Sequence, residues 1–176
     1  MPTIATVFQY TWTLNSTSEA TKALVSFQDY VLSPSVPAEI GFDFLILSGP
    51  EQGSLVVALF GAFFGEMVVY DEVIAPFIVT MPSEGSTANV TEGTWPETLA
   101  ALAIGPLDTS TLPTPMRDTF YAKSLMTPMG EPLTQDAIEA LMDYLANDAF
   151  VSDGVRFNAV TLILMKLRRL FIVLAY

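Results

Sequence analysis

The sequence predicts an α+β domain in which helices pack on one face of a largely antiparallel sheet. Residues 4–14 alternate between apolar and polar side chains, which is typical of a strand with one covered face. Residues 55–64 form an unbroken apolar run, which indicates an interior strand. The expected order is strand, helix, strand, strand, helix, then strand and helix. The simplest arrangement of that order is one sheet with its helices on one side.

The first helix is expected directly after the first strand. Ser16 and Glu19 have the spacing of a capping box, and apolar residues recur behind them at helical spacing. Two prolines in residues 33–37 end this helix. A second alternating segment at 42–47 predicts another strand, and the glycines and proline of residues 49–53 predict a turn.

The middle of the chain predicts one further helix and several connections. Residues 66–79 have a helical apolar pattern, and Pro76 is expected to kink this helix or end it early. Residues 81–94 are rich in polar residues, glycine and proline, and are expected to form a surface loop. Residues 95–104 suggest a short helix, and residues 105–117 suggest another long connection because they contain three prolines.

The next segment predicts a strand followed by the clearest helix of the chain. Residues 120–126 read as a strand. Thr134 is placed to cap the helix, with Leu133 and Ile138 as a hydrophobic staple. The helix is expected to close at Asn147 and Asp148. These elements complete the predicted α+β region, which spans residues 1–154.

Residues 155–176 differ from the rest of the chain and are treated as an atypical basic and apolar tail. They contain four of the seven basic residues and none of the 19 acidic residues. Three interpretations stay open: a buried helix or strand, a tail foreign to the fold, or a basic helix on a membrane surface. Its apolar stretches are too short to span a membrane. The N-terminus shows no signal peptide and enters a strand almost at once, so we expect the chain to begin inside a larger protein.

Composition excludes several kinds of chemistry. The chain has no histidine and no cysteine, which rules out a Ser-His-Asp triad, an imidazole or thiolate metal site, and disulfide bonds. Its formal net charge of −12 makes nucleic acid an unsuitable partner, because phosphate would be repelled. No glycine-rich nucleotide motif is present. The residues alone therefore predict neither catalytic residues nor a metal or cofactor site.

Several short stretches, taken in order, resemble the substrate domain of the berberine-bridge-like FAD-linked oligosaccharide oxidases. They are TVFQYTWTL, SFQDYV, LFGAFFG, TWPETLAALA and TFYAKSLMTPMGEPLTQDAIEALMDYL. The last stretch, residues 119–145, is the most specific, and the resemblance covers about residues 4–150. It implies the substrate-binding half of a secreted, extracellular FAD-dependent carbohydrate oxidase, incomplete and inactive alone.

The resemblance also implies partners that this chain does not contain. In the family the flavin is commonly attached through a histidine and a cysteine, lies in a separate FAD-binding domain, and takes a hydride from a sugar. This sequence has neither residue, so we expect no FAD to bind to this chain alone. A face left bare by the missing domain predicts dye binding or self-association. The alternative is a non-catalytic α+β binding or interaction module.

The candidate substrate-binding residues are Gln9, Thr11 and Thr13, on the more polar face of the first strand. The family geometry implies that this face looks toward substrate, where these side chains could hydrogen-bond to sugar hydroxyls. A solvated strand face is the competing interpretation. Tyr10 and Trp12 could stack on a sugar ring, although an alternating aromatic face is more often core.

The remaining candidates have ordinary structural interpretations beside the functional ones. Lys123 could pair with a core carboxylate or approach the flavin side. Asp43 and Glu39 are expected to be solvated acids, since no paired-carboxylate site is evident. Asn15 and Asn89 begin N-x-Thr sequons and are glycosylation candidates in predicted loops or caps, as a secreted parent would allow.

Overall fold

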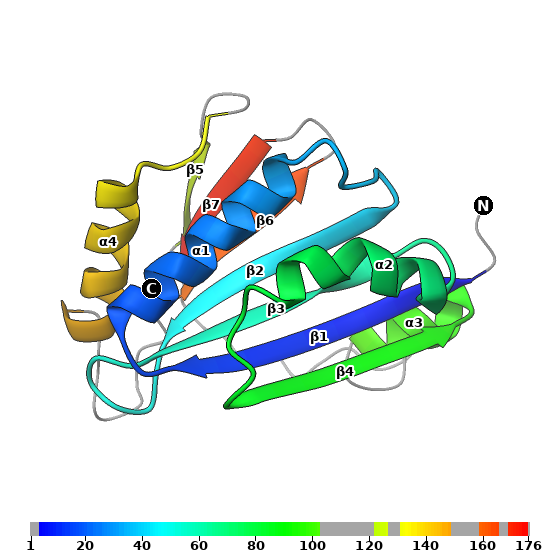
Figure 1. Cartoon of the computed structure of the whole chain (residues 1–176), viewed down its shortest axis with the longest axis horizontal. Helices are drawn as coiled ribbons and strands as arrows, with labels where there is room; N and C mark the ends of the chain where they lie inside the picture. The colour runs from blue at the N-terminus through cyan, green and yellow to red at the C-terminus, as the bar shows by residue number, and fades with distance from the viewer. Residues whose placement is uncertain (1–3, 103–121, 127–130, 149–158, 166–168, 176) are drawn as a thin grey trace, which may run out of the picture.

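The computed structural model describes residues 4–102, 122–126, 131–148, 159–165 and 169–175. In these residues one sheet of seven strands has the order β4-β1-β3-β2-β6-β7-β5, and every neighbouring pair is antiparallel (Figure 1). The strands are β1 (Ala5–Leu14), β2 (Ile40–Ser48), β3 (Leu55–Phe63), β4 (Ser86–Gly93), β5 (Ala122–Met126), β6 (Ala159–Met165) and β7 (Arg169–Ala175). The predicted α+β class is confirmed.

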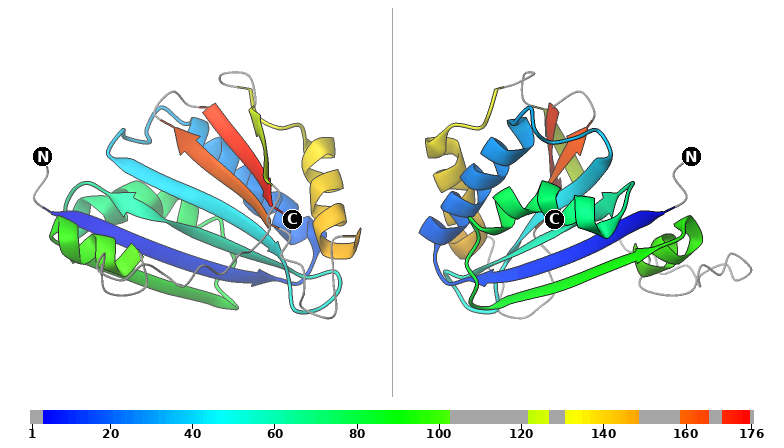
Figure 2. Two further views of the ribbon diagram at one scale, coloured as in Figure 1. Left: turned by 180° about the vertical axis from the view of Figure 1, so that it is seen from behind. Right: turned by 45° about the vertical axis from the view of Figure 1, so that its right-hand side comes forward.

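Helices cover mainly one face of this sheet. They are α1 (Thr17–Leu32), α2 (Met67–Ile78), α3 (Trp95–Leu102) and α4 (Gln135–Asp143), the last continuing as a π-helical turn, η1 (Tyr144–Asp148). Helices α1 and α2 lie on the same face, and α4 packs beside α1 (Figure 1). Helix α3 lies behind β1 and β4, on the other face, as the reverse view shows (Figure 2). The expected one-sided arrangement therefore holds for α1, α2 and α4, with α3 as the exception.

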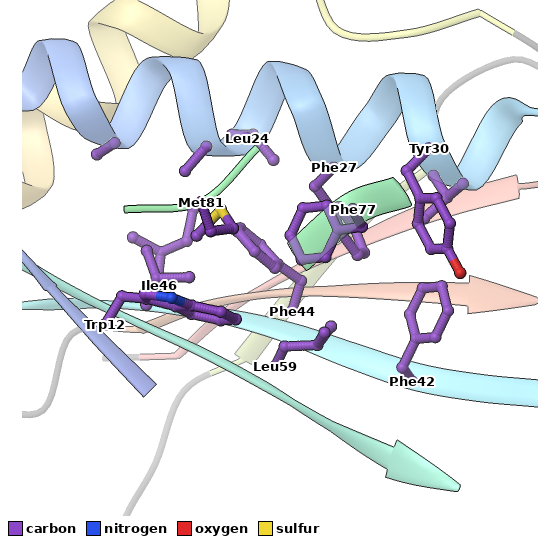
Figure 3. Packing of buried hydrophobic residues seen from close by; sticks show 14 of the residues in the cluster. Trp12, Leu24, Phe27, Tyr30, Phe42, Phe44, Ile46, Leu59, Phe77 and Met81 are labelled. Atoms are coloured by element: carbon purple, nitrogen blue, oxygen red, sulfur yellow. The ribbon is translucent and has the colours of Figure 1, made fainter. Parts of the chain in front are cut away.

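The core lies between the helix-covered face and α1 and α2 (Figure 3). At its centre the Phe27 ring of α1 stacks on Phe44 of β2, with ring centroids 4.3 Å apart. Phe77 of α2 meets the edge of the Phe27 ring at 5.8 Å. These three rings are fully buried, so together they hold both helices against the sheet.

The predicted helix starts are confirmed by their capping bonds. The Glu19 backbone N–H donates to Ser16 Oγ at 3.3 Å, and the Asn15 N–H donates to the Glu19 carboxylate at 3.0 Å. At α4, the Ala137 N–H donates to Thr134 Oγ1 at 3.3 Å. Each side chain satisfies a backbone donor that has no partner inside its helix.

Of the two effects expected of Pro76, an early end of α2 is excluded, and a kink stays a prediction. The helix continues to Ile78, and Pro76 lies exposed in its last turns. A proline there removes one intrahelical bond. The buried side chains of Tyr70, Ile74 and Phe77 keep the helix against the sheet in spite of that loss.

Residues 81–94 are not a surface loop throughout, because residues 86–93 form strand β4. This strand pairs with β1 over eight residues, from Ala5↔Gly93 to Trp12↔Ser86. Its polar sequence misled the prediction because an edge strand buries little side-chain surface. Backbone hydrogen bonds to its single neighbour define it instead.

Part of the C-terminal segment belongs to the same sheet. Strand β6 pairs with β2 on one side and with β7 on the other, and β7 also pairs with β5. Residues 159–165 and 169–175 are therefore strands and not helices. Their burial, which the first interpretation also predicts, stays a prediction. The predicted connection at 105–117 and residues 120–121 of the predicted strand lie outside the described residues.

Candidate functional site

The face of the sheet opposite α1 and α2 is the candidate site, because strand β1 points its polar residues there. Phe8, Trp12 and Leu14 are buried beneath the helices. Gln9 and Thr13, which alternate with them, are exposed. The alternation of a strand thus turns the predicted substrate-binding residues toward the open face, with Thr11 half-buried among them. Their role in binding stays a prediction.

Strand register aligns four side chains in one row across this open face. Gln9 of β1 lies opposite Asn89 of β4 on one side and opposite Phe60 of β3 on the other. Phe60 in turn lies opposite Asp43 of β2. Residues opposite each other in antiparallel strands share a face, with Cβ atoms about 5 Å apart. The row therefore places two amides, an aromatic ring and a carboxyl group side by side.

A cavity of about 190 Å³ lies at the amide end of this row. Helix α3 closes it on one side with Ala101 and Leu102, and the three strands β4, β1 and β3 form its floor. The lining residues are Val7, Phe8, Gln9, Phe60, Asn89, Thr91, Ala101 and Leu102. The volume is below the roughly 300–1,000 Å³ of a complete small-molecule site, so it suits one ring of a longer ligand.

Asp43 is the one charged side chain among the described open-face residues of β1 to β4. It is half-buried, and burial raises the pKa of its carboxyl group above the ordinary value of 3.8. The expectation of a solvated acid is therefore wrong for Asp43. Glu39, just before β2, is exposed as expected.

Tyr10 and Trp12 lie on the helix-covered face and belong with the core. Their rings stack on each other at 5.6 Å, and Trp12 is only 2% exposed. The Tyr70 hydroxyl donates to the Tyr10 hydroxyl at 3.2 Å, and burial is the main cause of a strongly raised Tyr70 pKa. Neither Tyr10 nor Trp12 faces the cavity, so the core interpretation fits and sugar stacking does not.

The remaining candidates fall in different places. Register puts Lys123 of β5 in one cross-strand row with Leu174, Val160 and Ile46. Both expectations for the Lys123 side chain, a core carboxylate or the flavin side, stay predictions.

The two sequons occupy different settings. Asn15 is exposed in the turn between β1 and α1, as expected. Asn89 lies in strand β4, where it lines the cavity, so the expectation of a loop is wrong. Glycosylation of either residue stays a prediction.

Asn89, Phe60 and Leu102 were missed as site residues. Asn89 was considered only as a sequon, since the polar stretch around it did not indicate a strand. Phe60 looked like interior core in an unbroken apolar run. Only the strand register brings Phe60 and Asn89 to either side of Gln9.

A second cavity, of about 250 Å³, lies between α1 and α4 and is lined by polar and charged side chains, away from the open face. Within the described residues, no three metal-ligating side chains come together. No helix of the described part of the chain is long and apolar enough to cross a membrane.

Comparisons with known proteins agree on this architecture. No protein-family model and no curated protein sequence matches the chain. The glucooligosaccharide oxidase of Acremonium strictum aligns with a TM-score of 0.74 and 20% identity, over 99% of this chain and 38% of that one. The BBE-like 1 protein of Physcomitrella patens aligns with a TM-score of 0.72 and 21% identity, over 99% of this chain and 38% of that one. The xylooligosaccharide oxidase of Myceliophthora thermophila C1, solved with xylobiose, aligns with a TM-score of 0.72 and 18% identity, over 99% of this chain and 39% of that one.

This chain has the fold of one part of the berberine-bridge-like FAD-linked oligosaccharide oxidases. It spans somewhat more than a third of the length of each of these three proteins. The expected resemblance is thus confirmed at the level of the fold. Strands β6 and β7 are included in that alignment, since it covers almost the whole chain.

FAD held as in the Acremonium enzyme does not fit this chain. A structure of that enzyme is described as containing a 6-S-cysteinyl, 8α-N1-histidyl FAD. Such attachments need a thiol and an imidazole, and this sequence contains neither. On the open face, the described side chains of β1 to β4 offer one carboxyl group and no cation to hold a pyrophosphate.

Proposed function

We propose that this chain is the substrate-binding part of a secreted, extracellular FAD-dependent carbohydrate oxidase, and that it is inactive without a FAD-binding domain. The observation that carries the proposal is the row Asn89–Gln9–Phe60 beside the cavity, on the open face of an oxidase-like fold. Amide groups hydrogen-bond to hydroxyls, and an aromatic ring packs against the apolar side of a sugar.

In this proposal the chain binds and orients the sugar, while the flavin of the second domain supplies oxidation. Gln9 and Asn89 offer both donors and acceptors to ring hydroxyls. Leu102 of α3 and Val7 exclude water from the apolar side of the cavity. Thr11 and Thr13 extend the polar strip along β1, which suits further units of an oligosaccharide.

A titration of the chain with xylobiose and with maltotriose tests the binding role. NMR shifts are expected at the backbone amides of Gln9 and Asn89. Gln9→Ala should weaken binding about three- to tenfold, the effect of one lost hydrogen bond. Gln52→Ala, in the exposed turn before β3, is the matched control and should bind like the parent.

Two results would contradict the proposal. Equal binding by Gln9→Ala and the parent chain, or shifts only at remote amides, would place the sugar elsewhere. Peroxide formation by this chain with added FAD and sugar would show that no second domain is needed. Absence of any sugar binding would favour the alternative of a non-catalytic interaction module.

A further inference from the structure

Among the residues that the structure describes, strand β4 is a long edge of the sheet with no second neighbouring strand (Figure 1). Its described partner is β1 alone, and its residues are exposed except for Val90 and Gly93, which are half-buried. Its register with β1 is continuous, so it has no bulge, and it contains no proline or lysine. Bulges, prolines and lysines are features by which natural proteins protect an edge strand from pairing with another chain, and β4 has none of them. The opposite edge, β5, has only five residues.

The direction of the backbone groups on this edge follows from one hydrogen bond. The Thr13 N–H donates to the Gly85 carbonyl, which continues the β1–β4 register. In an antiparallel ladder, hydrogen-bonded and non-bonded pairs alternate. Residues 87, 89 and 91 therefore direct their backbone groups toward β1, and residues 86, 88, 90 and 92 direct theirs outward from the edge.

We propose that β4 pairs with β4 of a second copy of this chain, around a two-fold axis that passes between the two Asn89 residues. In this register the outward-facing backbone N–H and C=O groups of Ala88 pair with those of Val90 in the partner copy. Hydrogen-bonded and non-bonded pairs then alternate as an antiparallel ladder requires. The Asn89 residues of the two copies lie directly opposite each other and form a non-hydrogen-bonded pair. The two-fold axis is perpendicular to the sheet, so both open faces lie on the same side of the enlarged sheet.

Side chains on the edge are compatible with this self-pairing. Thr87 lies opposite Thr91 of the partner copy, and such hydroxyl pairs are favourable neighbours in antiparallel strands. Glu92, the only charged residue of β4, lies opposite Ser86 of the partner copy and not opposite another carboxylate. Its carboxylate already accepts from the Met67 N–H at 2.6 Å. Charges more than about 8 Å apart are largely screened at physiological salt, which limits the repulsion between two chains that each carry a net charge of −12.

This pairing goes beyond the proposed function and has a consequence for the candidate site. Asn89 lines the cavity, so the axis would bring two cavities together on one continuous face. A glycan on Asn89 would occupy the same place, so glycosylation there and pairing of β4 exclude each other.

Cysteine cross-linking of the full chain tests the register, because the natural sequence contains no cysteine. Asn89→Cys should form a disulfide-linked dimer under mild oxidation, since the Cα atoms of a non-bonded pair lie about 4.5 Å apart. Thr87→Cys is the matched control on the same face. In the proposed register two copies of residue 87 lie four residues apart along the strands, about 13 Å, and should not cross-link. Equal cross-linking of the two variants would overturn the register.

Light scattering and sedimentation at physiological salt test the pairing itself. The parent chain, made without glycans, should be a concentration-dependent dimer. Ala88→Pro removes an outward-facing N–H that β1 does not use, and should give a monomer with an unchanged circular dichroism spectrum. Asn89→Lys opposes two like charges and should weaken the dimer about fivefold, whereas Thr87→Lys should not. A parent chain that is monomeric at every concentration, or an Ala88→Pro variant that is folded and still dimeric, would overturn the proposal.

Discussion

The side chain of Gln28 hydrogen-bonds to both backbone groups of Leu133, across 105 residues of sequence. The Leu133 N–H donates to Gln28 Oε1 at 2.7 Å, and Gln28 Nε2 donates to the Leu133 carbonyl at 3.4 Å. Gln28 is only 3% exposed. This one buried amide fixes the residue that precedes the Thr134 cap of α4 against α1.

Replacing Gln28 should therefore destabilise the fold more than replacing a glutamine on the surface. Gln28→Met keeps the length of the side chain but leaves the backbone groups of Leu133 without their partner, which should cost about 1–3 kcal/mol. Urea denaturation measures the loss. Gln135→Met is the control, because its amide reaches only Glu139 on the surface of α4 and should change stability by less than about 0.5 kcal/mol. Equal effects of the two changes would contradict this account.

Two glycines in neighbouring strands should respond oppositely to alanine. A Cβ on Gly61 of β3 would overlap the Gly41 carbonyl and lie 2.7 Å from Phe42 Cα, so Gly61→Ala should cost at least about 1–3 kcal/mol. A Cβ on Gly41 of β2 would meet nothing within 4 Å. Gly41→Ala should leave the free energy of unfolding unchanged or raise it by up to about 1 kcal/mol, because alanine restricts the unfolded chain. Thermal unfolding of both variants checks this, and a stable Gly61→Ala would show that β2 and β3 can separate.

Asp43 should make the fold less stable at neutral pH than at acid pH. Its pKa is raised in the folded state, so between 3.8 and that raised value the folded chain binds more protons than the unfolded chain. The contribution of Asp43 to stability is then present below pH 3.8 and is lost as pH rises through the folded pKa. Asp43→Asn should unfold at a higher temperature than the parent at pH 7, and the advantage should vanish below pH 3.8. Glu39→Gln, at an exposed acid, is the control; a constant difference at all pH values would refute the assignment.

Phe27 should be the most costly single truncation in the core. Its ring touches Phe44 and Phe77, so Phe27→Ala removes contacts to the sheet and to α2 together. The expected loss is about 3–5 kcal/mol, measured by chemical denaturation. Val79→Ala, at a residue that is 80% exposed, should have almost no effect. A loss below about 1 kcal/mol for Phe27→Ala would mean that the core closes around the missing ring.

The open face should bind an apolar dye when the chain is isolated. Leu45, Val56 and Phe60 lie there only partly covered. Leu45→Glu should reduce dye fluorescence, whereas Val79→Glu, directly after α2, should not. If both variants bind dye like the parent, the dye occupies another surface and the open face is not the exposed partner surface.

The alternation of residues 4–14 and the Ser16 cap determined the first strand, the first helix and the side toward which Gln9 points. These are local properties, because a strand alternates its side chains and a cap completes bonds within a few residues. The tertiary structure alone decided that residues 86–93 form an edge strand, that α2 passes through Pro76, and that residues 159–165 and 169–175 lie in the sheet. Each of these depends on hydrogen bonds or packing with residues distant in sequence, and the same distant pairing brings Asn89, Gln9, Phe60 and Asp43 into one row.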